Sequence, residues 1–396
     1  MTTTAKTTTT APPPWGSPQP VQPLWDRTVR RGPGVINVLL VVVAALVLVG
    51  LAWFLGSTLG GGALIVCGIL ALIPLSICVA GLMWIDRWDP EPRGALWFAF
   101  LWGAGISVVA TLVLGSYVTE LLSLALASTP SDVIGPVLQA PLVEEVAKGL
   151  GVLVLVFSRR SHFDGPVDGI VYAGMVGAGF AFTENILYFG AAAINGGGLG
   201  ELVSVFVIRG LFSPFAHVMF TAALGAVLGL AVARSGTRYI FPAFLAGLVP
   251  AIAGHMLWNG GLLVLFTDFF EFYFLIQLPL FLAALASIVA LRRAERRLTE
   301  NRLGGYAAAG WFTAQEVTML ATRGGRSQAL GWARRFGRYR SMKAFIRSAT
   351  RLAFTRQRIV AGHDVELNTG REQQLLADVT RLRTELLTTA ASNAHR

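Results

Sequence analysis

The stretch VINVLLVVVAALVLVGLAWFLG, residues 35–56, contains no charged side chain and one polar one, Asn37. A helix that spans a membrane needs about 20 consecutive apolar residues, because the hydrocarbon core of a bilayer is roughly 30 Å thick. The whole chain shares this character, since 54% of its 396 residues are hydrophobic and 14% are charged, whereas soluble domains carry about 25% charged residues. The composition predicts an all-α, polytopic transmembrane helix bundle.

Apolar stretches of similar length recur along the chain and predict about eight spans. Their ends are approximate, because sequence patterns locate element boundaries only to within a few residues. The sixth stretch is longer than one span requires, so we expect it to be tilted, kinked at Pro214 or partly interfacial. The predicted spans are residues 35–56, 62–85, 94–118, 134–158, 167–192, 202–232, 240–265 and 273–291.

The loops between these stretches differ in their content of Lys and Arg. Basic residues precede the first span and occur after the second, fourth and sixth, whereas none occurs in loops 57–61, 119–133, 193–201 and 266–272. Cytoplasmic loops carry an excess of Lys and Arg. The alternation therefore predicts eight spans rather than seven, with both termini in the cytoplasm.

Two segments lie outside the predicted transmembrane domain, residues 34–292. Residues 1–33 are rich in Thr and Pro, a composition that predicts a disordered cytoplasmic tail. The segment from Arg292 onward holds 20 Lys and Arg against 8 Asp and Glu, so its charge of +12 exceeds the +10 of the whole chain. We interpret residues 293–396 as a basic cytoplasmic tail of short amphipathic helices that binds anionic lipid headgroups. A protein-docking or partly disordered tail is the alternative, and no nucleic-acid-binding module supports a nucleic-acid partner.

Four polar clusters interrupt the apolar stretches, where an ionisable group costs roughly 2.5–3.5 kcal/mol. In the first, Glu144 and Lys148 share a helix face and Glu145 lies within reach of the same lysine. Two carboxylates in a low dielectric raise each other's proton affinity, and the ammonium offsets one of them. This arrangement suits a general base or acid, and a buried ion pair that fixes helix packing is the alternative.

The second and third clusters contain a carboxylate, an arginine and a histidine. Glu184 is followed by Asn185, so the glutamate is a candidate acid, base or metal ligand beside an amide donor. Arg209, Ser213 and His217 recur at four-residue intervals and so share one helix stripe. A satisfied structural network is the alternative for both clusters.

The fourth cluster pairs His255 with Asn259, again four residues apart. Such a pair can donate two hydrogen bonds to a developing oxyanion, hold an activated water or share a metal. These spans contain no Gly-x-Ser-x-Gly, Ser-Lys pair or His-Glu-x-x-His motif. The residues therefore favour a glutamate-activated water attacking a carbonyl, with or without a metal. A proton-coupled transporter or ion pathway using the same carboxylates, or a catalytically inactive membrane scaffold, stays open as the alternative.

At these residues the sequence resembles the PrsW family of intramembrane proteases, within the wider CAAX-protease-like (CPBP, ABI) group of membrane proteins. The resemblance covers about residues 80–262 and includes an acidic, proline-containing loop ahead of the four clusters. The motifs that carry it are DRWDPEPR (86–93), PLVEEVAK (141–148), FAFTENILY (180–188), RGLFSPFAH (209–217) and HMLWN (255–259).

The resemblance implies an intramembrane endopeptidase of a bacterial inner membrane that acts on membrane-anchored proteins, with the anti-sigma factors of regulated proteolysis as the known example. Glu184 stands where the CAAX-protease branch has histidine, which argues against prenyl-protein processing. The cofactor is either none or a divalent metal such as zinc, with Glu145, Glu184, His217 and His255 as candidate ligands. The implied catalytic residues are Glu144, Glu145, Glu184, His217, His255 and Asn259, supported by Lys148, Asn185 and Arg209. Analogy to the CAAX branch favours Glu145 over Glu144 as the base.

Overall fold

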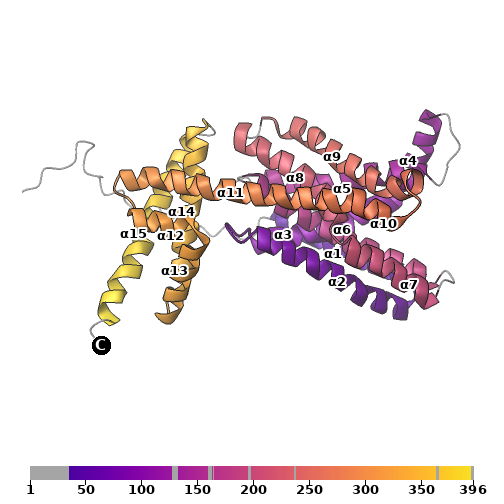
Figure 1. Ribbon diagram of the computed structural model, residues 1–396, viewed down its shortest axis with the longest axis horizontal. Helices are drawn as coiled ribbons and strands as arrows, with labels where there is room; N and C mark the ends of the chain where they lie inside the picture. The colour runs from indigo at the N-terminus through magenta and orange to yellow at the C-terminus, as the bar shows by residue number, and fades with distance from the viewer. Residues whose placement is uncertain are drawn as a thin grey trace, which may run out of the picture. The chain divides into compact units, whose positions relative to one another are not determined.

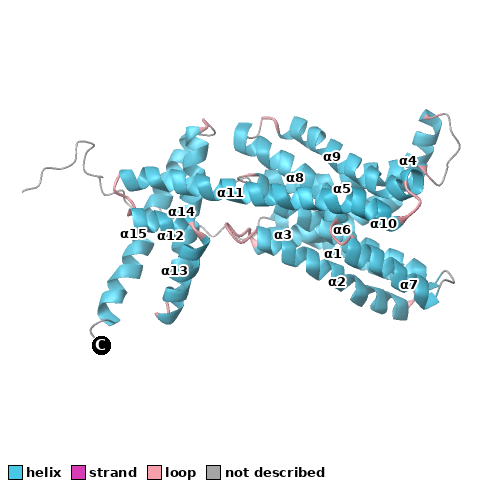
Figure 2. Ribbon diagram, in the orientation of Figure 1, coloured by secondary structure: helices cyan, strands magenta, loops and turns pink. Residues whose placement is uncertain are grey.

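The computed structural model describes residues 35–126, 133–158, 163, 165–194, 198–235, 238–362 and 365–393. The tail expected to be disordered, residues 1–33, lies outside these ranges. The chain divides into two units, Met1–Val43 and Ala44–Arg396, and apart from the start of α1 every element below belongs to the second. All regular structure in the described residues is helical (Figure 2), which confirms the predicted all-α class.

The apolar stretches form long helices, several of which contain a π-helical segment (Figure 1). Successive helices are separated by short connections. In chain order they are α1 (Val35–Leu59), α2 (Gly61–Ile85), α3 (Arg93–Leu101), η2 (Trp102–Ser107), α4 (Val108–Ala125), η3 (Ile134–Gln139), α5 (Ala140–Ser158), α6 (Pro166–Ile194), α7 (Gly198–Phe206), η4 (Val207–Phe212), α8 (Ala216–Ser235), α9 (Ile240–Gly260), η5 (Gly261–Leu265), α10 (Phe269–Phe272), η6 (Tyr273–Gln277) and α11 (Leu278–Ala308).

Seven helices in the described residues are long and apolar enough to cross a membrane, one fewer than the sequence predicts. The difference is the fourth predicted span, where η3 and α5 form a continuous helical segment that carries Glu144, Glu145 and Lys148. At about 1.5 Å of rise per residue this segment is roughly 37 Å long, which is sufficient for a crossing. Its three charges, rather than its length, separate it from the other seven, and the eighth crossing stays a prediction.

Helix α6 is the most buried of the seven, with 83% of the residues in its most apolar window inside the protein. It packs closely against α8 because small residues face each other along the contact. A Cβ added at Gly169 would lie 2.0 Å from the carbonyl oxygen of Gly225, and one added at Gly177 would lie 2.6 Å from that of His217. Only glycine allows this approach, which brings Glu184 of α6 and His217 of α8 to the same site.

The sixth predicted span is interrupted at Ser213, Pro214 and Phe215, between η4 and α8. Proline has no N–H to donate and disfavours helical geometry in the residue before it. Ser213 accordingly leaves the helix, with φ −127° and ψ 37°. The predicted irregularity at Pro214 is therefore a break, and α8 begins directly before His217.

The C-terminal segment is more ordered than a tail of short helices. The helices are α12 (Ala314–Ala321), α13 (Arg323–Arg335), α14 (Tyr339–Val360) and α15 (Val365–Asn393), and the last two have 22 and 29 residues. Together with the end of α11 they enclose a hydrophobic core that includes Leu303, Leu320, Phe345, Leu352 and Val379. The apolar faces of these amphipathic helices are therefore covered at least in part by one another.

Candidate active site

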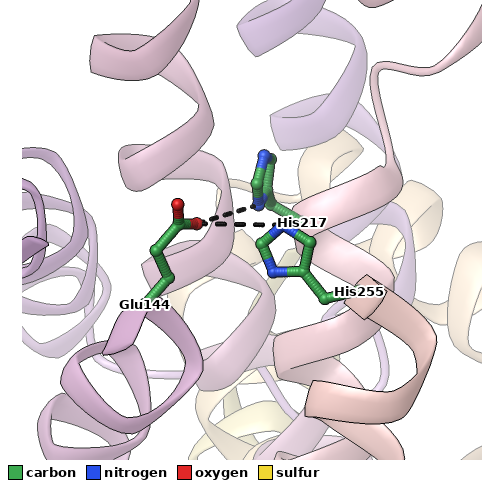
Figure 3. A group of neighbouring side chains, drawn as sticks. All are labelled: Glu144, His217 and His255. Carbon is green, nitrogen blue, oxygen red and sulfur yellow. Dashed lines mark ion pairs between the residues drawn. The ribbon is translucent and has the colours of Figure 1, made fainter. Parts of the chain in front are cut away.

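Four helices bring the predicted site residues together inside the bundle. Glu144 comes from α5, His217 from α8 and His255 from α9, and Figure 3 shows both imidazoles facing one carboxylate oxygen. The Oε2 atom of Glu144 lies 3.9 Å from Nδ1 of His217 and 3.9 Å from Nε2 of His255. All three side chains are buried, so the cluster predicted from separate motifs is one site.

Lys148 is fully buried beside this cluster, one turn along α5 from Glu144. Its ammonium donates hydrogen bonds to Oε2 of Glu144 at 3.1 Å and to Oε1 of Glu145 at 2.8 Å. It also lies 3.0 Å from Nδ1 of His217 and 3.8 Å from the centroid of the Phe180 ring. A buried charge needs such partners, because leaving it unpaired away from water is very costly.

The contacts of His217 fix its tautomer. An ammonium can only donate, so Nδ1 of a neutral His217 accepts from Lys148 and the proton is on Nε2. Nε2 faces Oε2 of Glu184 at 2.6 Å, which is a suitable acceptor. Glu184 also pairs with Arg209, whose Nε donates to Oδ1 of Asn185 at 3.1 Å. The supporting roles predicted for Arg209 and Asn185 thus correspond to a network that holds Glu184.

His255 is held as the other tautomer, with its proton on Nδ1. Its Nδ1 lies 3.1 Å from Oε1 of Glu145, which can only accept when ionised, so Nδ1 donates and Nε2 carries the lone pair. The other oxygen of Glu145 accepts a hydrogen bond of 3.0 Å from the hydroxyl of Thr221. Each imidazole therefore binds a different carboxylate through one nitrogen, and its other nitrogen lies 3.9 Å from Oε2 of Glu144.

Three contributors to the site were not among the predicted site residues. Thr221 lies one turn after His217 on α8, a spacing that would have identified it. Phe220 stacks on His255, with ring centroids 5.0 Å apart and planes 18° apart. Phe180 packs against His217 at 5.3 Å. An apolar aromatic within an apolar helix gives no sequence signal of such a role.

Asn259 makes a hydrogen bond to the backbone of η3. Its amide nitrogen donates a 2.8 Å hydrogen bond to the carbonyl oxygen of Pro136, in η3. The amide predicted to stabilise an oxyanion therefore connects α9 to the helical segment that carries Glu144.

The site has the donors that a divalent metal requires. One nitrogen from each histidine and one oxygen of Glu144 lie within 4.8 Å of one another, and two histidines with one glutamate are a known ligand set of catalytic zinc. Metal-binding histidines almost always donate their other ring N–H to a carboxylate or carbonyl, as His217 and His255 do here. The residues fit a metal if the Lys148 ammonium moves from its place beside Glu144 and His217.

Glu144, which was not among the predicted candidate ligands, joins His217 and His255 in the group of donors that lie together. Glu145 and Glu184, both predicted as candidate ligands, bind the far nitrogens of the two histidines. Glu144 takes the position between the near nitrogens. The sequence could not distinguish these roles, because adjacent residues of a helix diverge by 100° and only the neighbouring helices decide which carboxylate faces the histidines.

The fold and the site together define a polytopic helical membrane protein with a buried glutamate–histidine centre. Residues 91–284 match the family model described as PrsW family intramembrane metalloprotease. This range contains every predicted site residue, so the segment that carries the site is similar to the PrsW family.

Curated relatives named Protease PrsW match parts of the chain. The protein of Clostridioides difficile (strain 630) is 33% identical over 161 residues, which are 40% of this chain and 62% of the relative. That of Geobacillus kaustophilus (strain HTA426) is 30% identical over 162 residues, 40% of this chain and 65% of the relative. That of Bacillus subtilis (strain 168) is 29% identical over 146 residues, 37% of this chain and 60% of the relative. The chain thus covers less than two thirds of each of them. No solved structure matches it significantly.

Proposed function

We propose that this chain is an intramembrane endopeptidase that hydrolyses peptide bonds of membrane-anchored proteins. The observation that carries the proposal is the convergence of Glu144, His217 and His255, each imidazole held by a further carboxylate. A buried cluster of this composition is expensive inside a membrane, and such groups mark functional sites. The similarity of residues 91–284 to the PrsW family supports the same activity. The shared order of motifs supports a place in the wider CAAX-protease-like group.

In this proposal Glu144 accepts the proton of the attacking water. Its Oε2 atom accepts from Lys148 and faces both imidazoles. Glu145 is engaged through both oxygens, by Lys148 and His255 at one and by Thr221 at the other. The geometry thus favours Glu144 over Glu145, which was preferred by analogy. Glu145 is then a positioning residue that holds the His255 tautomer.

Glu144, His217 and His255 would hold a divalent cation such as zinc, which would supply a Lewis acid for the substrate carbonyl and for water. The protein's own residues prepare this site by directing two imidazole lone pairs and one carboxylate to a common point. The formal charges of Glu144, Glu145, Glu184, Lys148 and Arg209 sum to −1, which favours a further cation.

The oxyanion role predicted for Asn259 takes a different form in this proposal. Its amide positions η3 through Pro136, while Lys148 supplies the positive charge nearest to Glu144. Because Nδ1 of His255 donates to Glu145 and its Nε2 carries the lone pair, we propose that Lys148 stabilises the oxyanion, and that Asn259 maintains the distance between α9 and the segment formed by η3 and α5.

The full chain in nanodiscs, mixed with single-span reporter proteins, tests the activity. Glu144→Gln, His217→Ala and His255→Ala are each expected to abolish detectable cleavage, while Glu201→Gln, a change at an exposed residue of α7, retains it. Bound zinc per chain, measured by mass spectrometry after chelation and add-back, should fall in the same three variants. Cleavage at the wild-type rate in all three would refute the proposal, and proton-coupled uptake without cleavage would favour the transporter.

We also propose a substrate class, a membrane and an orientation for this protein. Membrane-anchored anti-sigma factors are the proposed substrates, in a bacterial inner membrane with both termini in the cytoplasm. Co-expression with single-span anti-sigma factors should release a shortened fragment that the Glu144→Gln variant does not release. We further propose that the basic C-terminal helices contact anionic headgroups, in which case the thermal stability of the full chain should be higher in anionic than in neutral nanodiscs, and less so at high salt.

A further inference from the structure

A cavity of about 140 Å³ lies between the start of α8, the end of α9 and the η6–α11 helix. Most of its wall is apolar, formed by side chains that include Phe215, Met219, Trp258, Leu278 and Phe281. An engineered apolar cavity of about 150 Å³ binds benzene. This cavity is therefore large enough for one leucine, methionine or phenylalanine side chain.

Gln277 lines the same cavity, together with the polar side chains of Ser213 and Tyr273. It is 3% exposed, and its side-chain oxygen has no hydrogen-bond partner among the described residues. An unpaired polar group costs several kcal/mol in a membrane interior, where water cannot replace the partner. Leucine would fill the same position without this cost, so the glutamine indicates a ligand that donates a hydrogen bond.

The cavity adjoins the active-site helices. Met219 lies two residues after His217 on α8, and Trp258 lies three residues after His255 on α9. Phe220 connects the two regions, since its ring stacks on His255 at 5.0 Å and contacts Trp258 at 5.8 Å. A group in the cavity would therefore lie beside the residues that surround the two histidines.

The opposite wall of the cavity is formed by the candidate span Phe269–Ala308, which is the span least buried inside the protein. Only 6% of the residues in the most apolar window of Phe269–Ala308 are buried, compared with 83% for α6. At the cavity this span is held by ring contacts, with Phe281 stacked on Phe215 at 5.2 Å. Because protein covers little of this span, a membrane-anchored substrate would approach the cavity from the side of this wall.

A substrate of the proposed protease supplies the missing donor. A membrane helix must unwind locally before a peptide bond can be attacked, and each unwound residue exposes a backbone N–H that lipid cannot satisfy. Building on the proposed function, we propose that this cavity is a substrate subsite. It takes one leucine, methionine or phenylalanine side chain of a membrane-anchored protein, and Gln277 accepts a hydrogen bond from a backbone N–H beside it.

Reporter proteins that differ only in the residues next to the cleaved bond test the subsite with the full chain in nanodiscs. Leu278→Trp, which fills the cavity, should lower kcat/KM for reporters with leucine or phenylalanine at the preferred position by about tenfold or more, and affect alanine reporters less. Leu280→Trp is the matched control, because Leu280 is on the same helix but 44% exposed and outside the cavity wall.

Gln277→Leu separates a binding role from a structural one. It should leave the melting temperature unchanged or raised, because it removes an unpaired buried oxygen, and it should lower kcat/KM about tenfold. A glutamine that served only packing would show the opposite pattern, with lower stability and unchanged kcat/KM in the folded fraction.

A binding measurement distinguishes failure of the subsite from failure of the proposed activity. A reporter carrying photo-leucine, bound to the Glu144→Gln variant, should cross-link to Met219 or Leu278. Cross-linking without cleavage by the wild type would support the subsite and refute the protease. Normal cleavage with no cross-link, and no effect of Gln277→Leu or Leu278→Trp, would overturn the subsite. If neither cleavage nor cross-linking occurs, both proposals are wrong.

Discussion

His217 and His255 present different ring nitrogens to Glu144, and each is held by a different carboxylate. The pairing of His217 with Glu184 and of His255 with Glu145 fixes two tautomers at once. Removing either carboxylate would free an imidazole to rotate or to exchange its proton between nitrogens. These two glutamates therefore matter for the preparation of the site even though they do not face its centre.

Glu184→Gln tests this role. The neutral amide can no longer pair with Arg209 and accepts a weaker hydrogen bond from His217, so zinc affinity and kcat/KM should fall about 10- to 100-fold. Glu201→Gln, on the neighbouring helix α7 and exposed to the surroundings, should change neither. Wild-type zinc affinity and activity in Glu184→Gln would show that the carboxylate does not position the histidine.

Asp86, directly after α2, provides a pH-dependent contribution to stability. Burial raises the pKa of its carboxyl to about 7, and the backbone N–H of Glu91, which it accepts at 3.0 Å, opposes this only in part. Because the folded pKa is above the unfolded value of 3.8, the stabilising proton is fully present below that value and lost as pH rises through about 7. The melting temperature should fall between pH 5 and 8, and Asp86→Asn should reduce this slope. Asp378→Asn, at a half-buried site whose side chain is 50% exposed, should keep it.

The residue types of the site could be predicted from the sequence, but their division of roles could not. Glu144, His217 and His255 were identified because polar groups in apolar helices are costly. Their mutual orientation depends on helix rotation and on packing between α5, α8 and α9, which no local pattern encodes. The same limit applies to Asn259, whose amide nitrogen donates to the carbonyl oxygen of Pro136, while its oxyanion role stays a prediction.

At the level of helices, the contact between α6 and α8 sets the distance between Glu184 and His217. It depends on Gly177, because an added Cβ would lie 2.6 Å from the carbonyl oxygen and 3.0 Å from the carbonyl carbon of His217. Neither atom can rotate away, since both belong to the helix backbone. A larger residue must therefore separate the two helices.

Gly177→Ala should destabilise the protein by about 1–3 kcal/mol and lower cleavage more than the loss of folded protein explains. The melting temperature and the activity per folded molecule in nanodiscs provide the two measurements. Gly94→Ala is the control, because a Cβ at that position has no neighbour within 4 Å. Equal behaviour of the two variants would contradict a close contact at Gly177.

The helices that face lipid could be located from the sequence, because their formation depends on the length and apolarity of each stretch. Pro214 also gave a correct signal, since the chemistry of proline acts locally to break the helix before α8. The C-terminal helices were not predictable to the same degree. Their lengths depend on burial against one another, as at Leu352 and Val379, and a basic amphipathic sequence is equally compatible with a lipid surface.

Across the whole molecule, Arg326 connects the C-terminal helices to the loop between α2 and α3. Its guanidinium lies 3.4 Å from the ring centroid of Trp88 and donates to the carbonyl oxygens of Trp88 and Leu320 at 2.7 and 2.6 Å, and to the hydroxyl of Thr350 at 2.8 Å. Burial lowers the pKa of Arg326 to about 9, so the group stays charged at pH 7 and all four contacts persist.

The loop between α2 and α3 also contacts the helix bundle, through Glu91. Tyr172 of α6 donates a 2.5 Å hydrogen bond to Oε2 of Glu91, and α6 also carries Glu184. The loop of residues 86–92 is thus held from both sides, by a buried arginine of α13 and by the central helix of the bundle. Loss of the contacts on one side of this loop should make the connection between the bundle and the C-terminal helices more accessible to a protease.

Arg326→Ala should therefore destabilise the packing of the C-terminal helices by roughly 2–4 kcal/mol, because it leaves buried acceptors without donors. Arg326→Lys should recover only part of this loss, since a single ammonium cannot reproduce the planar fork of a guanidinium. Limited proteolysis of the full chain in nanodiscs should then cut within residues 309–313 several times faster than in the wild type, while Arg335→Ala, an exposed position on the same helix, should leave the rate unchanged. If Arg326→Ala is cut no faster than Arg335→Ala, the guanidinium does not hold the two parts together, and the stability of this junction must come from the apolar contacts around Leu303 and Leu320.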